Sequence, residues 1–469
     1  MTLINQNDPQ LADLFKNLQG NILKGHGRDH TANIFIRAKS GKKTAVKNWL
    51  KGLVAQNVIT STKEQLEETV RFKQTGIGGG MFGTILISAE GFEYLGFDDG
   101  GFQKEFRGGM KKADLNDPKS DVWEKGLRPG IHFLLIIGDD DATKVSVAAE
   151  KFKTEIKTFG TVTTTEFGEA LRNKPQPGER KGAGIEHFGY VDGTSQPLFF
   201  EDEIVRYKAD NDIIGNNFIY NPSADKSLVL VKDPLSGAEN AFGSYFVFRK
   251  LEQNVQGFKV NEEKLADDLG LEGEDGERAG AMLVGRFENG TPIELQKTDV
   301  MAKSAVRNDF DYQTNDNSKC PFHAHIRKSN PRSANPKEDL AATQSHIMAR
   351  RGIPFGTRKP GDDPNDGETE NKPTGGVGLL FMSYQASLAH QFEFIQKKWV
   401  NNKKFPFDDR GGLDPVIGQD KTTSQSKGKF AVEWGSINSL AEGSFEHFLK
   451  MRGGEYFFAP SIPFLRQLG

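Results

Sequence analysis

The sequence feature that most constrains the fold is a strongly apolar strand followed at once by an amphipathic helix. Residues 132–137 read HFLLII, and a short apolar run bounded by polar residues is typical of a buried strand. Three aspartates at 139–141 follow and provide a helix N-cap. Apolar side chains then recur at helical spacing, at positions 145, 148, 152, 156 and 159. The pattern predicts a strand that leads directly into a helix.

Similar units are predicted on both sides of this one. In the first half, strands are predicted at residues 32–38, 67–74 and 83–88, and a helix at 46–54. We interpret the first half as β-α-β-β-α-β-α-β, an order that contains the ferredoxin-like arrangement. In the second half, residues 244–248 and 377–384 read as strands, each followed by a helical pattern, from Leu251 and over 388–399 respectively. The sequence therefore predicts a duplicated α+β architecture, although no residue-level repeat is visible.

The chain of 469 residues is longer than a usual single domain, so two domains are expected. Between about residues 210 and 239 the composition turns polar, with frequent Asn, Asp, Ser and Gly, which is typical of a domain boundary. We predict an N-terminal domain at 1–220 and a C-terminal domain at 240–469. The acidic, Pro/Gly-rich stretch 358–373 is predicted to be a surface insertion, and its oxygen ligands lack the spacing of a calcium loop.

Composition excludes several classes of function. The net charge of −3 and a pI near 6.4 give no reason to expect nucleic acid or an anionic membrane as a partner. The single cysteine, Cys320, excludes internal disulfides and the usual covalent c-type haem attachment. No signal-peptide pattern and no membrane-spanning apolar run is visible, so a cytoplasmic protein is expected. The glycines at 78, 80 and 83 have dinucleotide-site spacing, but a β-rich run follows them where such a site needs a helix.

The densest chemistry lies at residues 320–332, which read CPFHAHIRKSNPR. His323 and His325 stand two positions apart, and an imidazole is a good ligand for iron, zinc or copper. The basic side chains that follow suit a bound anion such as a carboxylate or phosphate. A metal-bearing ligand with acidic arms, such as haem with its two propionates, would use both features. The alternative is a basic surface loop that contains two unrelated histidines.

Three other segments are candidates for a site. Residues 186–197, EHFGYVDGTSQP, place Asp192 between glycine and aromatic residues, where the alternative is a turn in which the aspartate bonds its own backbone. Residues 350–356, RRGIPFG, place arginine before a rigid turn, where the alternative is a helix C-terminus. In QFEF, residues 391–394, Glu393 lies between two phenylalanines. This favours partial burial, and a buried carboxylate needs a partner, such as a metal-bound imidazole. The alternative, and the commoner case, is an acid on a solvated helix face.

Together these segments resemble the dye-decolorizing peroxidases, a family of haem peroxidases, and in particular their long-chain fungal-like branch. The segment GLLFMSYQASLAHQFEFIQ at 378–396 also matches, as do both ends of the chain, LQGNILKGHGRDH at 18–30 and GGEYFFAPSIPFL at 453–465. The match runs from Leu18 to Leu465, and several long motifs in the right order make it specific.

The resemblance implies two ferredoxin-like α+β domains with antiparallel sheets, of the dimeric α+β barrel type. One non-covalent haem b per chain would be held mainly by the second domain. His325, in the family's His-Ile-Arg-Lys motif, is the implied iron ligand, whereas His323 lies where the family keeps no ligand. Arg332 is implied to pair with a haem propionate, and Glu393 to accept the Nδ1 proton of His325.

The resemblance also implies which residues lie on the distal side of the haem, opposite the iron ligand. Asp192 would be the acid–base group and Arg350 its partner, a choice over Arg351 that follows the family's Arg-x-Gly/Asn order. Leu379 and Phe381, which alternate on one strand, would wall this side.

The implied activity is reduction of hydrogen peroxide coupled to oxidation of small-molecule electron donors, including bulky anthraquinone-type dyes and phenols. Because aspartate has a lower reference pKa than histidine, activity should favour acidic pH. No nucleic acid or membrane partner is expected, and a homo-oligomer is compatible with the sequence.

Two other functions compete with this one. A haem-binding or haem- and iron-handling protein would need no peroxidase turnover, but Asp192 and Arg350 favour the enzyme because storage requires neither. Cargo of a protein nanocompartment would carry a C-terminal targeting tail, whereas this chain stops at RQLG directly after the last motif, so we do not expect that role.

Overall fold

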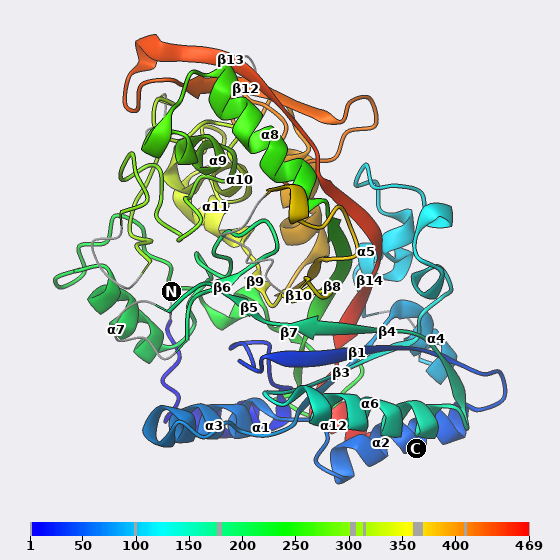
Figure 1. The fold of residues 1–469 in the computed structure, drawn as a ribbon. Helices are drawn as coiled ribbons and strands as arrows, with labels where there is room; N and C mark the ends of the chain where they lie inside the picture. The colour runs from blue at the N-terminus through cyan, green and yellow to red at the C-terminus, as the bar shows by residue number, and fades with distance from the viewer. Residues whose placement is uncertain are drawn as a thin grey trace.

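The fold is organised around one large antiparallel sheet. The computed structural model describes residues 2–97, 101–175, 181–300, 306–312, 316–359, 369–407 and 410–468. Within them, ten strands form a sheet whose main path is β10-β11-β8-β14-β2-β3-β1-β4 (Figure 1). Its strands are β1 (His30–Ala38), β2 (Phe82–Ile87), β3 (Phe133–Asp139), β4 (Gly160–Glu169), β7 (Val231–Lys232), β8 (Phe242–Gln253), β9 (Ala349–Arg350), β10 (Ile353–Phe355), β11 (Gly378–Gln385) and β14 (Leu449–Ala459).

The remaining elements cover this sheet or extend from it. Two small hairpins pair β5 (Leu171–Arg172) with β6 (Gly184–Ile185) and β12 (Gln425–Ala431) with β13 (Leu440–Glu446). The α-helices are α1 (Ala12–Asn17), α2 (Lys43–Ala55), α3 (Thr62–Thr75), α4 (Ala89–Leu95), α5 (Lys104–Gly108), α6 (Ala142–Ile156), α7 (Glu201–Asp210), α8 (Val255–Asp268), α9 (Glu277–Val284), α10 (His325–Ser329), α11 (Leu340–Ser345) and α12 (Ile462–Gln467).

Shorter helical elements complete the chain. Two are π-helical, η9 (Leu388–Phe392) and η10 (Ile395–Val400), and together they make one helical segment over residues 388–400. The 3-10 turns are η1 (Pro9–Leu11), η2 (Met110–Lys112), η3 (Ser120–Val122), η4 (Lys125–Leu127), η5 (Lys226–Leu228), η6 (Gly273–Asp275), η7 (Arg332–Ala334), η8 (Thr369–Asn371) and η11 (Ile437–Ser439). None of the helices in the described ranges is long and apolar enough to cross a membrane.

The sheet consists of two halves with the same strand order. In the first half, β1 to β4 lie in the order β2-β3-β1-β4, with α2 and α3 between β1 and β2 and α6 between β3 and β4. In the second half, β8, β10, β11 and β14 lie in the equivalent order β10-β11-β8-β14. Here α8 precedes β10, and the 388–400 segment precedes β14. Each half is a ferredoxin-like βαββαβ unit, so the predicted α+β fold class is confirmed.

The two halves are joined within the sheet. Strand β14 of the second half pairs with β2 of the first at Phe458 and Ile87. Strands from both predicted domains therefore belong to one sheet. The division into domains at 1–220 and 240–469 stays a prediction.

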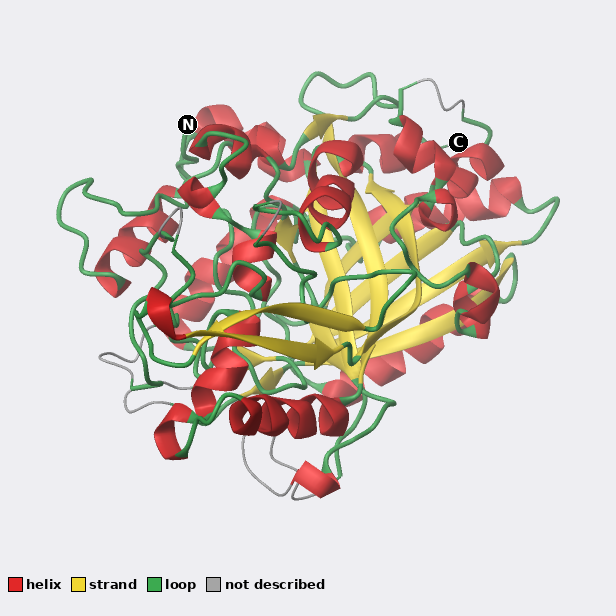
Figure 2. Cartoon of the chain, turned by 90° about the horizontal axis from the view of Figure 1, so that it is seen from above, coloured by secondary structure: helices red, strands yellow, loops and turns green. Residues whose placement is uncertain are grey.

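The sheet curls so that its two halves face each other (Figure 2). Phe35 on β1 packs against Phe248 on β8 with ring centroids 4.7 Å apart, although four strand positions along the sheet separate β1 from β8. At the two ends of the strand order, β4 also approaches β10. A Cβ atom at Gly168 on β4 would lie 2.4 Å from the Cγ2 of Ile353 on β10, so this contact requires glycine. The arrangement approaches a closed barrel and agrees with the expected barrel type.

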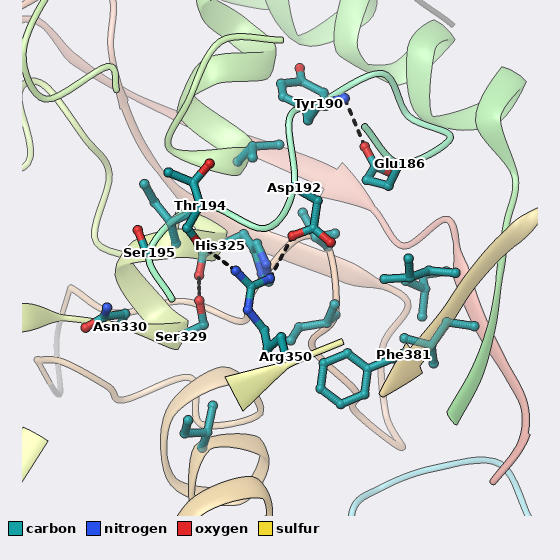
Figure 3. Close-up of a pocket in the computed structure, with 18 of the residues that line it drawn as sticks. Glu186, Tyr190, Asp192, Thr194, Ser195, His325, Ser329, Asn330, Arg350 and Phe381 are labelled. Atoms are coloured by element: carbon teal, nitrogen blue, oxygen red, sulfur yellow. Dashed lines mark hydrogen bonds and ion pairs between the residues drawn. The ribbon is translucent and has the colours of Figure 1, made fainter. Parts of the chain in front are cut away.

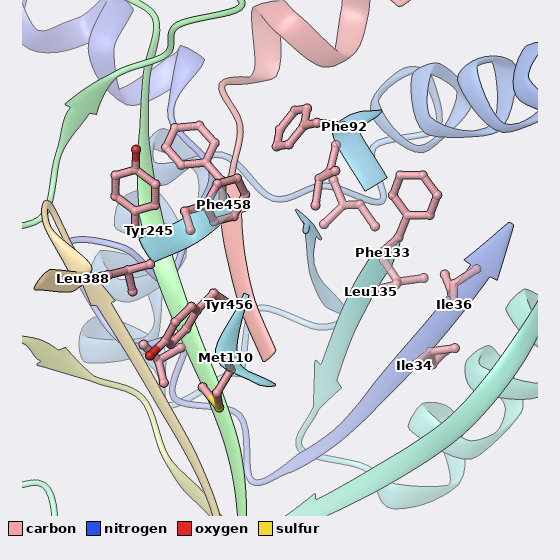
Figure 4. Close-up of a cluster of buried hydrophobic side chains, with 14 of the residues drawn as sticks. Ile34, Ile36, Phe92, Met110, Phe133, Leu135, Tyr245, Leu388, Tyr456 and Phe458 are labelled. Atoms are coloured by element: carbon pink, nitrogen blue, oxygen red, sulfur yellow. The ribbon is translucent and has the colours of Figure 1, made fainter. Parts of the chain in front are cut away.

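A second apolar layer covers the outer face of the sheet. Figure 4 shows Ile34 and Ile36 of β1 and Phe133 and Leu135 of β3 on the same side, with Phe458 of β14 in the same cluster. Because apolar groups cover both faces, every residue of β3 is buried. This explains why the central strand reads as an unbroken apolar run.

Most predicted elements are present, but residues 67–74 are not a strand. They belong to α3, which begins with a capping box between Ser61 and Glu64 and ends at Gly76 in the left-handed conformation. The strand predicted at 244–248 is longer, since β8 continues to Gln253 and α8 begins only at Val255. In the predicted insertion at 358–373, residues 360–368 lie outside the described ranges.

The buried ion pairs of Lys250 test how strongly the two halves depend on each other. Its ammonium on β8 lies 2.7 Å from Glu124 and 2.8 Å from Glu166 of β4, and both Lys250 and Glu166 are buried. We expect K250M to lower the free energy of unfolding by about 3–5 kcal/mol, because Glu166 keeps its charge without a partner.

Urea denaturation followed by tryptophan fluorescence measures the loss. The control is K63M, which removes an exposed pair with Glu67 and should change the free energy by about 0–1 kcal/mol. Equal stability of K250M and K63M would contradict the expectation.

Candidate functional site

A cavity in the second half collects most of the residues singled out in the sequence. It lies against β8 and β11 and is closed by α10, by the 388–400 segment and by residues 186–195 of the first half. Figure 3 shows side chains from these segments converging on it. Six predicted site residues line it: Asp192, His325, Arg332, Arg350, Leu379 and Phe381. The structure thus brings together residues that lie up to 189 positions apart (381 − 192).

His325 is the first residue of α10 and is held by a carboxylate that the sequence did not indicate. Its Nδ1 lies 2.9 Å from Oδ2 of Asp414. Asp414 is fully buried, and its Oδ1 accepts hydrogen bonds from the backbone N–H groups of Val416 at 2.8 Å and Ile417 at 2.9 Å. Because Asp414 accepts the proton of Nδ1, the lone pair of Nε2 is left available for a metal ion.

The charges of this pair reinforce one another. Burial disfavours the imidazolium form of His325, but the charge and hydrogen bond of Asp414 outweigh it and hold the pKa of His325 above its usual value. Burial likewise disfavours the carboxylate of Asp414, yet His325 and the two backbone N–H groups hold its pKa below the usual range. Asp414 therefore remains a strong acceptor for the imidazole proton.

Glu393 does not occupy the position expected for it. Its Oε1 accepts a hydrogen bond from the hydroxyl of Tyr456 at 3.0 Å, and its Oε2 pairs with Lys397 at 2.6 Å. The 388–400 segment turns Phe392, Ile395 and Gln396 toward the cavity, so Glu393 faces β14 instead. The expectation that Glu393 accepts the Nδ1 proton of His325 is wrong, and Asp414 takes that place.

Asp192 and Arg350 form the second polar pair of the cavity. Nη1 of Arg350 lies 2.7 Å from Oδ1 of Asp192, and Nη2 donates to the backbone oxygen of Thr194 at 2.8 Å. Gly193, at a φ of 81°, donates its N–H to the same carboxylate oxygen at 2.6 Å. Arg351 instead donates to the backbone oxygens of Asn21 and Ile22. The geometry therefore favours Arg350 over Arg351 as the partner of Asp192.

The environment keeps Asp192 ionised. Burial alone would raise the pKa of this carboxyl group, but the Arg350 charge and the Gly193 N–H outweigh it and hold the pKa below its usual value. Glu186, another carboxyl group of the cavity, behaves in the opposite way. Burial raises its pKa to about 7, although the N–H groups of Phe188 and Tyr190 and the Gln253 amide donate to it. Two carboxyl groups of the cavity therefore differ in charge near neutral pH.

Two buried arginines lie at another part of the cavity wall. Arg286 and Arg332 both donate to the side-chain oxygen of Asn308, each at 2.8 Å, and otherwise to backbone oxygens and Ser195. Neither forms an ion pair with any acidic side chain in the described ranges. Burial and the charge of Arg332 lower the pKa of Arg286 to about 9. Two adjacent guanidinium groups without a counter-ion are suited to a dianionic ligand.

His323 lies away from the cavity lining. It is buried against the edge of Phe430, with ring centroids 4.8 Å apart, and burial lowers its pKa to about 4. Within the described part of the chain, neither ring nitrogen has a hydrogen-bond partner. This placement agrees with the prediction that His323 is not the ligand.

Fold and site define a protein of two ferredoxin-like units with one cavity that is lined by the imidazole of His325 and by the Asp192–Arg350 ion pair. The family model for the C-terminal part of Dyp-type peroxidases matches residues 215–409. The chain is 42% identical to a multifunctional dye peroxidase, DyP2, from Amycolatopsis sp., over 98% of this chain and 97% of the relative. It is 30% identical to a dye-decolorizing peroxidase of Exidia glandulosa, over 81% of this chain and 74% of the relative.

Solved structures agree with these sequence relationships. The crystal structure of a DyP-type peroxidase from Anabaena sp. matches with a TM-score of 0.89 and 36% identity, over 100% of this chain and 97% of that one. The DyP2 structure from Amycolatopsis sp. matches with a TM-score of 0.89 and 40% identity, over 99% of both chains. The chain therefore belongs to the Dyp-type, or dye-decolorizing, peroxidase family and is a peroxidase.

Peroxidases of this family depend on haem, and the residues of the cavity fit that group. Haem needs an axial ligand with a free lone pair, apolar walls for its ring and cations for its two propionates. The cavity offers the Nε2 of His325, the side chains of Leu379 and Phe381, and the unpaired guanidinium groups of Arg286 and Arg332. Arg286 and Asp414 were not identified from the sequence, since neither lies in a segment that stood out.

Asp414 and Glu393 are the two candidates for the carboxylate that binds Nδ1 of His325, and the haem-free protein can distinguish them. Because Asp414 raises the pKa of His325, we expect D414N to lower that pKa. Glu393 bonds Tyr456 and Lys397, so E393Q should leave it unchanged. NMR titration of the His325 imidazole measures both effects, and a fall in E393Q alone would restore Glu393 as the partner.

Proposed function

We propose that this chain is a haem b peroxidase that reduces hydrogen peroxide and oxidises bulky organic donors such as anthraquinone-type dyes and phenols. One non-covalent haem per chain would occupy the cavity, with His325 as the iron ligand. The carrying observation is that His325, whose Nδ1 is bonded to Asp414, lines the same cavity as the Asp192–Arg350 pair. The names of the relatives, a multifunctional dye peroxidase and a dye-decolorizing peroxidase, support this class of donor.

When bound, haem supplies a redox-active iron that exchanges electrons with peroxide and with donors. His325 holds it through Nε2. Asp414 fixes the orientation of the imidazole and, by accepting the Nδ1 proton, gives it anionic character that favours the higher oxidation states of iron. Arg332, together with Arg286, would bind the propionates and so set the rotation of the ring in the cavity.

Asp192 and Arg350 handle protons and charge. Asp192 would accept a proton from one oxygen of hydrogen peroxide and return it to the other oxygen, which leaves as water when haem supplies the electrons. Arg350 would stabilise the negative charge that develops on the leaving oxygen. Because the Arg350 charge and the Gly193 N–H hold the pKa of Asp192 below its usual value, the base stays ionised in mildly acidic solution. The rate should fall only as the pH drops through that lowered pKa.

Storage of haem without turnover would need neither of these residues. An arginine and an aspartate that pair in the wall of the cavity favour the enzyme.

The ligand assignment predicts different outcomes for two neighbouring histidines. We expect H325A to lose the normal haem absorption spectrum, since it removes the axial ligand. H323A should keep that spectrum, because His323 lies outside the cavity lining. Absorption spectra of the purified, haem-reconstituted variants measure this, and loss of the spectrum in both would mean that the ligand is wrongly assigned.

The acid–base assignment predicts slow reaction with peroxide at normal haem content. D192N removes the proton acceptor and should slow the reaction about 10²–10⁴-fold. R350L removes the cation and should slow it about 10²–10³-fold. The measurement is stopped-flow absorbance after mixing with hydrogen peroxide, at several pH values. Wild-type rates in both variants would overturn the assignment and favour a haem carrier.

A further inference from the structure

Lys328 is a buried ammonium group whose partners are all backbone oxygens. It is fully buried, and its Nζ donates to the carbonyl oxygens of Asn402 at 2.7 Å, Phe405 at 2.8 Å and Gly412 at 2.7 Å. No acidic side chain in the described ranges pairs with it. Burial lowers its pKa to about 7, which reflects the cost of keeping this charge away from water.

The three acceptors belong to one loop, and that loop carries Asp414. Gly412 is two residues before Asp414, whose own N–H donates to the carbonyl oxygen of Val400 at 3.1 Å. The loop also packs closely on the chain before α10, because a Cβ atom at Gly412 would lie 2.7 Å from the Cβ of His323. A shift of the loop would therefore move Asp414 relative to α10.

His325 and Lys328 lie three residues apart, on the same short helix. The helix thus contacts this part of the chain twice, once from the imidazole to Asp414 and once from the ammonium to the carbonyl oxygens of Asn402, Phe405 and Gly412. An ammonium group has three N–H donors that can point in different directions, which matches three separate acceptors. The contacts of Lys328 hold the loop against the helix, and in this position Asp414 reaches His325.

We propose that Lys328 is a positioning residue for the iron ligand: it holds the carbonyl groups of Asn402, Phe405 and Gly412 so that Asp414 stays within hydrogen-bond distance of His325. This inference rests on the proposed role of His325 as the iron ligand. Its consequence concerns the reduction potential of the haem iron, because the strength of the bond from imidazole to Asp414 determines how much electron density the ligand supplies.

The sign of the effect separates positioning from a direct effect of the lysine charge. Removing a nearby positive charge favours the ferric state and lowers the potential. Loosening Asp414 weakens electron donation by His325 and raises it. We expect K328M to raise the potential, in the same direction as D414N. An unchanged or lower potential would overturn the proposal.

A double-mutant cycle with the haem-loaded protein is the decisive experiment. Spectroelectrochemical titration gives the potentials of wild type, K328M, D414N and K328M/D414N. If Lys328 acts through Asp414, K328M adds no further upward shift in the D414N background. Upward shifts that simply add in the double variant would overturn the proposal. The iron–imidazole stretching frequency in resonance Raman spectra should fall in K328M as it falls in D414N.

A matched control removes a buried lysine elsewhere. K250M also loses a buried ammonium, but Lys250 pairs with Glu124 and Glu166 outside the cavity lining. It should lose stability and keep the wild-type potential. If K328M does not fold, K328Q is measured in the same cycle: it loses the charge and, with two N–H donors for three acceptors, at least one of the three contacts. A K328Q potential above wild type supports positioning, and one at or below it overturns the proposal.

The failure of this inference is distinguishable from failure of the proposed function. Retention of the haem spectrum in H325A would remove the ligand assignment and both proposals with it. Loss of that spectrum in H325A, with an unchanged potential in K328M, would remove only the role of Lys328.

Discussion

The hydrogen bond between His325 and Asp414 is the interaction on which the site depends. It joins a five-residue helix to a loop 89 positions further along the chain, and it determines which nitrogen of the imidazole faces the cavity. A short helix has little intrinsic stability, so its orientation must come from tertiary contacts. Asp414 supplies one from its side chain, and α10 itself supplies the other through Lys328. The imidazole of His325 is therefore held by its surroundings more than by its own helix.

Charge is arranged unevenly around the cavity. The two guanidinium groups of Arg286 and Arg332 have no acidic partner in the described ranges, whereas Arg350 is neutralised by Asp192. The wall of the cavity is therefore positively charged at Arg286 and Arg332 and close to neutral at the Asp192–Arg350 pair. The buried charges of Arg286 and Arg332 destabilise the protein without haem. Binding of a dianion should neutralise these charges and so raise the free energy of unfolding.

Sequence reasoning succeeded where local pattern determines structure. The apolar run at 132–137 and the helix after it are β3 and α6, and motif order led to Asp192, His325 and Arg350 in one cavity. It failed at 67–74 because the Ser61–Glu64 capping box, which marks the start of α3, was overlooked in favour of a local β-like composition. It also failed at Glu393, since a side chain's direction on an irregular π-helical segment is decided by packing against Tyr456. Asp414 could not be found because Asp-Pro by itself signals only a turn.

The strand order determines which half of the sheet can form first during synthesis. The first half has all four of its strands once residue 169 has emerged, so it can form while the rest is still being made. The second half begins at β8 but needs β14, some two hundred residues later (449 − 253 = 196), to cover one edge of β8 and one edge of β2. Until then both edges are unpaired and open to pairing with other chains. The two edges are therefore exposed for most of the time in which the second half is synthesised.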